Sequence, residues 1–215
     1  MDGFPGIPTL AYVTCVVASR HDPRRLYAVF NNWKRGDFRP YVLRSDDLGR
    51  NWTSIAGNLP DGHVVWDLVE DPENEDLLFL GTEFGLFFTR DGGEHWHELG
   101  GGVPTIPFRD LAIQRRENDL VGATFGRGFF ILDDYSPLRT ADNALSAGPV
   151  LFASRDTWLF NTDARRGWGE KGDFGTQRYV AENPPHGAVF SYYLPEGLKD
   201  CQRFITHFII RQYLQ

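Results

Sequence analysis

Residues 45–52 read Ser-Asp-Asp-Leu-Gly-Arg-Asn-Trp, and residues 89–96 read Thr-Arg-Asp-Gly-Gly-Glu-His-Trp. Both octapeptides fit the pattern Ser/Thr-x-Asp-x-Gly-x-x-Trp, and Trp52 and Trp96 are 44 residues apart. A period of 20 to 50 residues indicates a repeat architecture, in which each copy is one supersecondary unit that packs against its neighbours. The two octapeptides therefore mark equivalent places in consecutive units.

Each octapeptide suits a tight turn between two antiparallel strands. In the first copy, the hydroxyl of Ser45 and the carboxylate of Asp47 can accept hydrogen bonds from turn amides. Gly49 can take the positive φ of the turn, and Trp52 can bury its indole over the hairpin. We therefore predict a structural role for these side chains. The same roles fall to Thr89, Asp91, Gly93 and Trp96.

The flanking sequence repeats as well, and it predicts short strands. Three units each contain an apolar stretch, a polar turn and a second apolar stretch, at 13–30, 64–82 and 108–124. A third apolar stretch follows in each, at 41–44, 86–89 and 129–132, and a fourth strand is expected after each Trp. The spacing is typical of propeller blades. We predict an all-β fragment of a β-propeller with about three four-stranded antiparallel blades.

These segments carry a resemblance to a known family. With residues 38–47, 80–86 and 126–134, the sequence resembles the Asp-box, or BNR-repeat, β-propellers. That group includes sialidases, xyloglucan-degrading glycoside hydrolases and sortilin-type ligand-binding propellers. The nearest likeness is to bacterial proteins described as sortilin-like or as glycosyl hydrolase BNR repeat. The scaffold hosts divergent functions, so the resemblance predicts the fold better than the activity.

The resemblance also implies a domain order. Residues 1–138 are expected to form partial propeller blades, 139–177 a linker, 178–199 the start of an Ig-like β module and 200–215 an atypical tail. A short helix is one prediction for 202–213. Three blades cannot close a propeller, which has four to eight. We therefore expect a C-terminal propeller fragment whose other blades belong to a longer parent chain.

The composition of the chain argues against two classes of partner, nucleic acid and membrane. The 215 residues carry a formal net charge of −7, and Lys34, Lys171 and Lys199 are the only lysines. Nucleic-acid binders need clustered basic residues, so nucleic acid is not expected as a partner. No apolar run reaches the length of a membrane helix, and no signal peptide is recognised in this chain, although we expect the parent to be secreted or periplasmic.

No cofactor or metal is expected. Cys15 and Cys201 are too far apart in sequence for a metal motif or a disulfide framework. His95 and His97 flank Trp96 in an expected strand, so both would point to one face, but no third ligand accompanies them.

The candidate ligand-binding residues come from loops at the end of the blades opposite the octapeptides. Trp33 can stack on a sugar ring or a peptide side chain, and charged neighbours can bind polar groups. The alternative is a loop held by internal Arg–Asp contacts, and Glu83 and Arg127 can either form an ion pair or face a ligand. The candidates are Trp33, Arg35, Asp37, Arg39, His63, Glu83 and Arg127.

Two functions follow from these residues. The first is a non-catalytic propeller that binds a peptide, protein or glycan. The alternative is part of a sialidase- or xyloglucanase-like glycoside hydrolase whose catalytic residues lie partly in missing blades. A hydrolase needs two carboxylates across one cleft, and Asp37, Asp61 and Glu83 are the carboxylates expected at the correct end.

Overall fold

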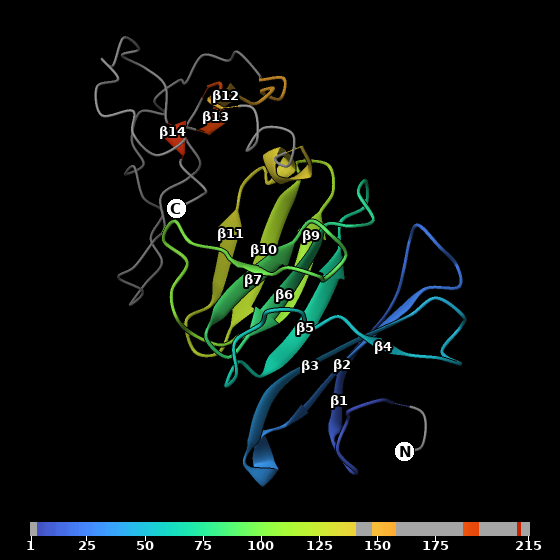
Figure 1. Cartoon of the computed structure of the whole chain (residues 1–215). Helices are drawn as coiled ribbons and strands as arrows, with labels where there is room; N and C mark the ends of the chain where they lie inside the picture. The colour runs from blue at the N-terminus through green and yellow to red at the C-terminus, as the bar shows by residue number, and fades with distance from the viewer. Residues whose placement is uncertain (1–3, 141–147, 158–186, 194–209, 212–215) are drawn as a thin grey trace, which may run out of the picture.

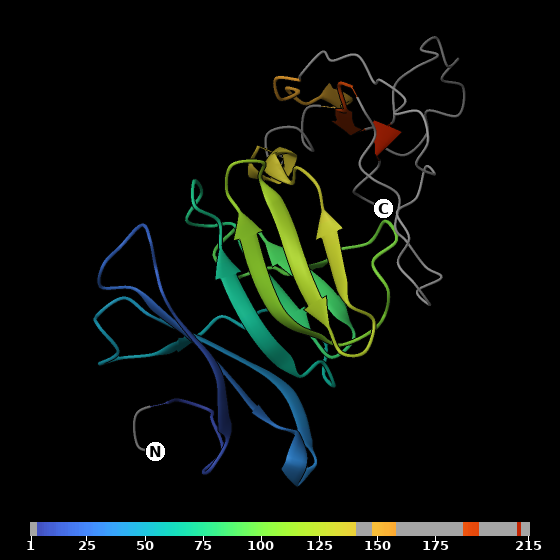
Figure 2. The same cartoon turned by 180° about the vertical axis from the view of Figure 1, so that it is seen from behind.

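The computed structural model describes residues 4–140, 148–157, 187–193 and 210–211. Over these residues the protein is all-β, and its only helical segments are two short 3₁₀ turns, η1 (Trp33–Arg35) and η2 (Ser136–Arg139). Three antiparallel sheets follow one another along the chain and lie side by side in space (Figures 1 and 2). This arrangement is that of consecutive propeller blades, as the 44-residue repeat predicts.

The first sheet contains β1 (Tyr12–Ala18), β2 (Leu26–Asn32), β3 (Asp37–Ser45) and β4 (Thr53–Ser54), paired in that order. The second contains β5 (Val65–Glu70), β6 (Leu78–Thr82), β7 (Gly85–Thr89) and β8 (His97–Glu98), again in order. Each neighbouring pair is antiparallel, and each first strand carries a register shift opposite its partner, at Val13/Cys15 and at Val65/Asp67. The two sheets are therefore copies of one blade.

The third sheet is shorter than predicted. It contains β9 (Phe108–Gln114), β10 (Asp119–Thr124) and β11 (Phe129–Leu132), with β11 at its edge. The chain after β11 lacks the glycine and tryptophan of the box and turns into η2 instead of a fourth strand. The described blades are thus two of four strands and one of three.

Two apolar cores lie between these sheets. Alternate residues of β2 and β6 face each other between the first and second sheets, and Trp96 joins them there. Phe79 and Phe88 face Phe108 and Leu120 between the second and third sheets. The outer side of the first sheet is covered by the N-terminal segment, where Phe4 packs against Phe30 and Trp52.

The segment after the blades contains three short strands. β12 (Val150–Leu151) pairs antiparallel with β13 (Phe190–Tyr193), which pairs parallel with β14 (Ile210–Arg211). The helix predicted for 202–213 is therefore wrong at Ile210 and Arg211, because pairing with β13 overrides the near-helical spacing of apolar residues. The rest of that segment and most of the predicted linker lie outside the described residues. The domain boundaries stay predictions.

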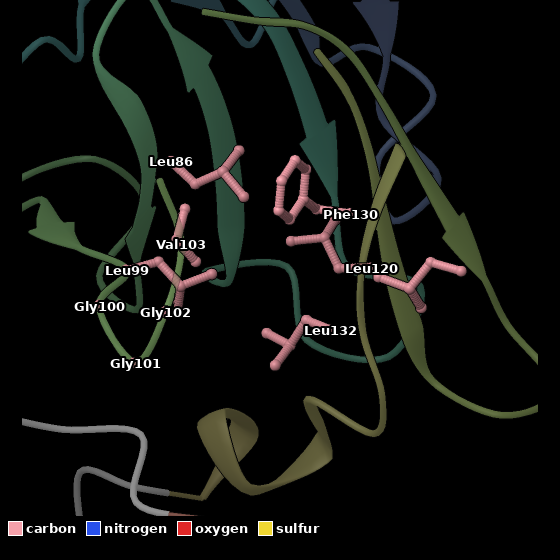
Figure 3. A pocket seen from close by; sticks show the side chains of 10 residues that line it. Leu86, Leu99, Gly100, Gly101, Gly102, Val103, Leu120, Phe130 and Leu132 are labelled. Carbon is pink, nitrogen blue, oxygen red and sulfur yellow. The ribbon is translucent and has the colours of Figure 1, made fainter. Parts of the chain in front are cut away.

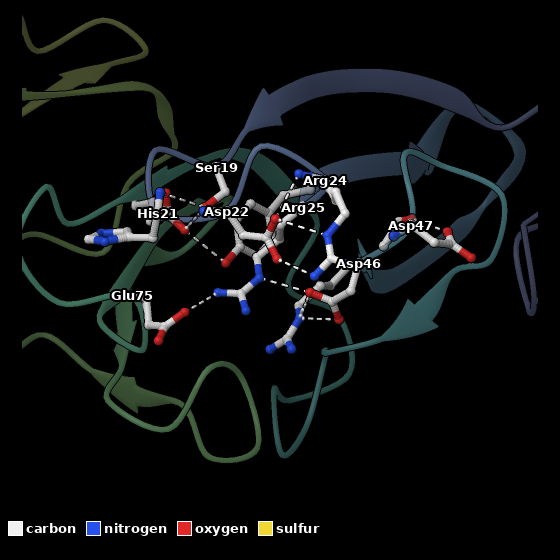
Figure 4. Close-up of polar contacts among 12 residues, drawn as sticks. Ser19, His21, Asp22, Arg24, Arg25, Asp46, Asp47 and Glu75 are labelled. Carbon is white, nitrogen blue, oxygen red and sulfur yellow. Dashed lines mark hydrogen bonds and ion pairs between the residues drawn. The ribbon is translucent and has the colours of Figure 1, made fainter.

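The box turns and the β1–β2 and β5–β6 turns meet at one end of the blades, which we call the hairpin end. Arg25 bridges this end, since its guanidinium lies 2.8 Å from Asp46 of the first sheet and 2.8 Å from Glu75 of the second (Figure 4). The backbone N–H of Gly92 donates to the carbonyl of Asp76 at 3.0 Å. The β2–β3 and β6–β7 loops lie at the opposite end of the blades.

A second polar contact at the hairpin end is buried. The carboxylate of Asp71 accepts from Arg139 at 2.7 Å and from the Tyr135 hydroxyl at 2.7 Å. Burial raises the pKa of Asp71, but the hydrogen bonds from Arg139 and Tyr135 outweigh it and keep the pKa below its ordinary value. This contact fastens η2, and with it the third sheet, to the second sheet.

No helix among the described residues is long and apolar enough to cross a membrane.

Candidate functional site

A groove opens at the end of the blades opposite the hairpin end. It has a volume of about 210 Å³ and is formed where the β2–β3 loop, the β6–β7 loop and the start of β9 meet. We call it the aromatic groove, because four of its eight lining residues are aromatic. The lining residues are Trp33, Phe38, Gly62, Val64, Trp66, Glu83, Phe84 and Arg109.

Polar groups in the groove are fixed against its aromatic floor. The guanidinium of Arg109 lies 3.5 Å from the centre of the Trp66 ring, within the range of a strong cation–π contact. The indole N–H of Trp66 donates to the carboxylate of Glu83 at 2.8 Å, and Arg109 lies 3.6 Å from the same carboxylate. Glu83, Trp66 and Arg109 are thereby held as one unit with a defined orientation.

Three further aromatic side chains of the groove are open to solvent. Trp33 is 42% exposed, Phe38 51% and Phe84 44%. Exposed aromatic rings gathered in one groove are typical of a ligand surface, because their apolar faces gain from being covered while the fixed polar groups give direction. The groove therefore offers flat apolar platforms beside one carboxylate and one guanidinium.

Two ring or guanidinium nitrogens near the groove lack partners. The Nε of Arg109 is buried and makes no hydrogen bond to the described residues. The Nδ1 of His63 is likewise unpaired, and its ring packs edge-on against Phe84 and Phe87. Burial lowers the pKa of His63, partly offset by Glu98, so the imidazole is neutral near pH 7. Unpaired buried polar atoms favour a site that a polar ligand completes.

The charged candidates Arg35, at the end of η1, and Asp37 and Arg39, at the start of β3, do not line the groove. Asp37 accepts from Arg39 at 2.9 Å and from the Tyr41 hydroxyl at 2.6 Å. The hydrogen bonds from Arg39 hold the pKa of Asp37 well below its ordinary value. Arg35 donates to the carbonyl of Leu10 at 2.7 Å and lies over the Tyr12 ring. These contacts match the alternative of a loop held by internal pairing.

Of the two alternatives for Glu83 and Arg127, the ion pair between them does not form. Glu83 contacts Trp66 and Arg109 rather than Arg127, and Arg127 is exposed and makes no hydrogen bond or ion pair with the described residues. Glu83 and Trp33 do share the aromatic groove. Of the seven candidates, these two line it, His63 packs beside it, and Arg35, Asp37, Arg39 and Arg127 are not part of its lining.

The box side chains are saturated by their own turns. Asp47 accepts from the backbone N–H of Asn51 at 2.8 Å, and Ser45 accepts from that of Gly49 at 2.9 Å. The Asn51 hydrogen bonds lower the pKa of Asp47 to about 2. Trp52 donates its indole N–H to the Gly49 carbonyl at 2.9 Å. Both oxygens of the Asp47 carboxylate therefore accept hydrogen bonds within the turn.

The second box repeats this pattern. Burial raises the pKa of Asp91, but hydrogen bonds from His95 and Thr89 outweigh it and hold the pKa at about 2. Gly93, at φ +104°, donates its N–H to Thr89 at 3.1 Å, and the Trp96 indole donates to Ile55 at 2.8 Å.

The two histidines differ from the prediction. Of the two, only His97 lies in a strand, while His95 binds Asp91. Ligand atoms of Asp91, Glu94 and His95 lie within 4.8 Å of one another, but all three residues are exposed and Asp91 is already occupied, so we assign no metal there.

In sequence, part of the chain is similar to two xyloglucanases. No family model matches the chain. It is 30% identical over 66 residues to a probable oligoxyloglucan-reducing end-specific xyloglucanase of Neosartorya fischeri, which covers 28% of this chain and 8% of that protein. It is 26% identical over 127 residues to a xyloglucanase of a Paenibacillus species, which covers 54% of this chain and 12% of that protein. The chain thus has weak homology to xyloglucanases and spans about a tenth of their length.

Solved structures with similar folds include three GH74 proteins. The GH74 enzyme of Niastella koreensis matches 57% of this chain and 21% of its own, with a TM-score of 0.47 and 18% identity. The GH74 xyloglucanase of Xanthomonas campestris matches 57% and 22%, with a TM-score of 0.44 and 16% identity. An ancestral GH74 enzyme matches 54% and 14%, with a TM-score of 0.44 and 22% identity.

Six of the eight lining residues were not among the predicted candidates: Phe38, Gly62, Val64, Trp66, Phe84 and Arg109. Trp66 and Arg109 lie within strands, where alternation alone cannot say which side chains reach the loop end. The register shift between Val65 and Asp67 places Trp66 outside the regular ladder. An available signal was the internal repeat itself, because Trp66 and Arg109 each precede an aspartate at the same point of their units.

Proposed function

We propose that the aromatic groove binds a glycan, and that the chain supplies this surface to a propeller of the glycoside-hydrolase type. The observation that carries the proposal is the groove itself, with Trp33 and Phe84 exposed beside Glu83 and Arg109. A pyranose ring has apolar C–H faces and equatorial hydroxyls, so it can cover an aromatic ring while bonding to a carboxylate and a guanidinium. The xyloglucanase names of the relatives favour a xyloglucan-like substrate.

The binding role and the hydrolytic role rest on different residues. Hydrolysis requires two carboxyl groups about 5 to 9.5 Å apart on either side of the scissile bond. Among the described residues, Glu83 is the single carboxylate in the groove lining, while Asp37 is engaged by Arg39 and Tyr41. We infer that a hydrolytic centre at this groove takes a second carboxylate from outside the described residues, in keeping with further blades in a longer parent.

The hydrogen bonds of the two box hairpins support their assignment as Asp-box turns. In both, a Ser or Thr hydroxyl and an Asp carboxylate accept backbone N–H groups of the turn, and the Trp indole donates to a carbonyl. We infer that these are Asp-box hairpins of the BNR type, with a structural role.

A peptide or protein ligand, as in sortilin-like propellers, is the alternative occupant of the groove. The binding test described next distinguishes the two ligands.

The test is a titration of the chain with xyloglucan oligosaccharides, in which binding is measured by calorimetry and by tryptophan fluorescence. We expect saturable binding that Trp33→Ala weakens about tenfold, which corresponds to loss of one stacking contact. Phe129→Ala is the matched control, because Phe129 is 74% exposed on the third sheet and does not line the groove.

Three outcomes would count against this function. Binding of peptides but not of oligosaccharides would favour the sortilin-like alternative. Equal affinity of the Trp33→Ala variant would remove the groove as the binding surface. Release of reducing ends by the chain alone would contradict the inference of a second carboxylate from elsewhere.

A further inference from the structure

The third sheet lacks a strand that the other two sheets possess. In the first sheet the N–H of Ile55 donates to the carbonyl of Val42 at 2.9 Å, and in the second the N–H of Leu99 donates to that of Leu86 at 2.8 Å. These bonds close β4 onto β3 and β8 onto β7. In the part of the chain that the structure describes, no strand pairs with the outer edge of β11.

The strand register identifies the free backbone groups of β11. Leu78 is paired with Thr89 in the second sheet, and Leu120 with Leu132 in the third. Counting back from these pairs, Phe129 stands where Leu86 stands and Ile131 where Phe88 stands. Because Phe88 is the partner of His97 in β8, the backbone of Ile131 faces the open edge. β11 thus presents a short unpaired ladder.

An apolar cavity of about 300 Å³ adjoins this edge, between the second and third sheets (Figure 3). The side chains of Leu86, Leu99 and Val103 face it from one side, and those of Leu120, Phe130 and Leu132 from the other. Three glycines, Gly100–Gly102, form its rim. No charged side chain lines it, so it suits a large apolar group rather than a sugar or an ion.

Trp96 fills the equivalent position between the first and second sheets. That side chain is 3% exposed and lies between the first and second sheets, where its indole donates to the carbonyl of Ile55. By register, Leu99 corresponds to Ile55, and Leu120 to Leu78. The counterparts of the cavity lining share one core with Trp96: Val42, Ile55, Ala56, Leu59, Leu78 and Phe87. The cavity is therefore the site of a tryptophan that the third unit lacks.

The chain does not fill this site with its own next residues. Trp96 is seven residues after Thr89, and the residue seven after Leu132 is Arg139. Arg139 instead binds Asp71 at the hairpin end, at 2.7 Å. Tyr135 does not line the cavity either, since its hydroxyl donates to Asp71 and its ring packs on Phe79. Among residues 4–140, neither a strand covers the β11 edge nor a side chain fills the cavity.

We propose that the β11 edge and this cavity form a docking site for an extended peptide strand that carries a tryptophan. The strand adds antiparallel to β11, its backbone bonds to the outward groups of Phe129 and Ile131, and its indole enters the cavity, as Trp96 does one sheet earlier. The partner is a polypeptide segment with the chemistry of His95–Leu99 of this chain. This inference is independent of glycan binding at the aromatic groove, which uses none of these residues.

The test uses a labelled synthetic peptide that copies residues 93–100, Gly-Glu-His-Trp-His-Glu-Leu-Gly. Binding to the full chain is followed by fluorescence anisotropy and by amide shifts in two-dimensional NMR spectra, which detect dissociation constants up to the millimolar range. We expect saturable binding, with shifts confined to β11 and the cavity lining. A Trp96→Ala version of the peptide should bind at least about tenfold more weakly, because it cannot fill the cavity.

Two variants of the chain block the site in different ways. Leu132→Trp places an indole in the cavity from β11 itself, and Ile131→Pro removes an outward N–H from an edge strand, where proline is tolerated. Both should abolish peptide binding, while an unchanged urea unfolding transition reports that each variant is folded. Val16→Thr is the control, because Val16 is 63% exposed on β1 and does not line the cavity, so this variant should bind as the wild type does.

Absence of binding to the folded wild-type chain would overturn the proposal, as would equal affinity of the alanine peptide. Binding that survives both blocking variants would overturn it as well.

Discussion

Replacing Asp71 with asparagine tests how the second and third sheets are fastened at the hairpin end. The carboxylate of Asp71 is fully buried and has five donors around it. Oδ1 accepts from the Tyr135 hydroxyl and from Arg139, while Oδ2 accepts from the backbone N–H groups of Glu73 and Asn74 and from Arg139. An amide has the same shape but one acceptor oxygen, so its NH₂ must face donors on one side.

The expected loss follows from these contacts. At least two hydrogen bonds to a charged group are lost, each worth about 1.5 to 3 kcal/mol, and Arg139 is left with a weaker partner. Breaking a buried ion pair costs about 3 to 5 kcal/mol in other proteins. We therefore expect Asp71→Asn to lower the free energy of unfolding by about 3 to 4 kcal/mol, a large part of the 5 to 15 kcal/mol of a typical domain.

The assay is urea unfolding at neutral pH, followed by tryptophan fluorescence. Glu73→Gln is the control, because Glu73 contacts the same Arg139 at 2.9 Å but its side chain is 63% exposed. Exposed pairs contribute about 0 to 1 kcal/mol, so this variant should unfold nearly as the wild type does. A loss below 1 kcal/mol for Asp71→Asn, or equal losses for both variants, would refute the reasoning.

Three further outcomes are expected. Trp96→Ala should lower the free energy of unfolding by about 3 to 5 kcal/mol, because a side chain 3% exposed leaves a cavity; a loss below 1 kcal/mol in the same urea assay would contradict this. Because hydrogen bonds lower the folded-state pKa of Asp47 and Asp91 to about 2, their contribution to the free energy of unfolding should be complete above pH ~4 and fall as the pH drops toward 2; the double variant Asp47→Asn/Asp91→Asn should make this acid-induced loss of stability smaller, and an unchanged loss would contradict the reasoning. In a Cys201→Ser background, Cys15 should react with a thiol reagent at pH 8 only on unfolding, since burial and the neighbouring Asp67 raise its pKa to about 12; fast labelling of the folded chain would refute this.

The repeat predicted the blades because local rules and packing agree there. Alternating apolar residues, turn residues and the box glycines all favour the same strands, and the structure places two four-stranded sheets at the positions of the two boxes. The third sheet ends early where the box is incomplete, at Asp133 to Pro137. Loss of a turn signal in the sequence thus coincides with loss of a strand in the structure.

The candidate site was harder to predict, since it depends on contacts between units. Trp33 and Glu83 were placed at the correct end because the topology of a blade puts their loops there. An Arg–Asp contact within this loop was one of two alternatives, and only side-chain geometry shows that Asp37 pairs with Arg39 and also with Tyr41. The stacking of Arg109 on Trp66 joins residues 43 positions apart on adjacent sheets, which no single-sequence pattern specifies.

The bridge made by Arg25 at the hairpin end has a consequence for how this protein can change. The buried Asp71–Arg139 contact also joins neighbouring sheets at that end, whereas the Trp33, Phe38 and Phe84 side chains at the other end are 42 to 51% exposed and contribute less to cohesion. On the proposed glycan-binding role of the groove, exchanging those three rings should alter which ligand binds while the fold tolerates the change. A library randomised at these positions is a direct route to new specificity on an unaltered scaffold.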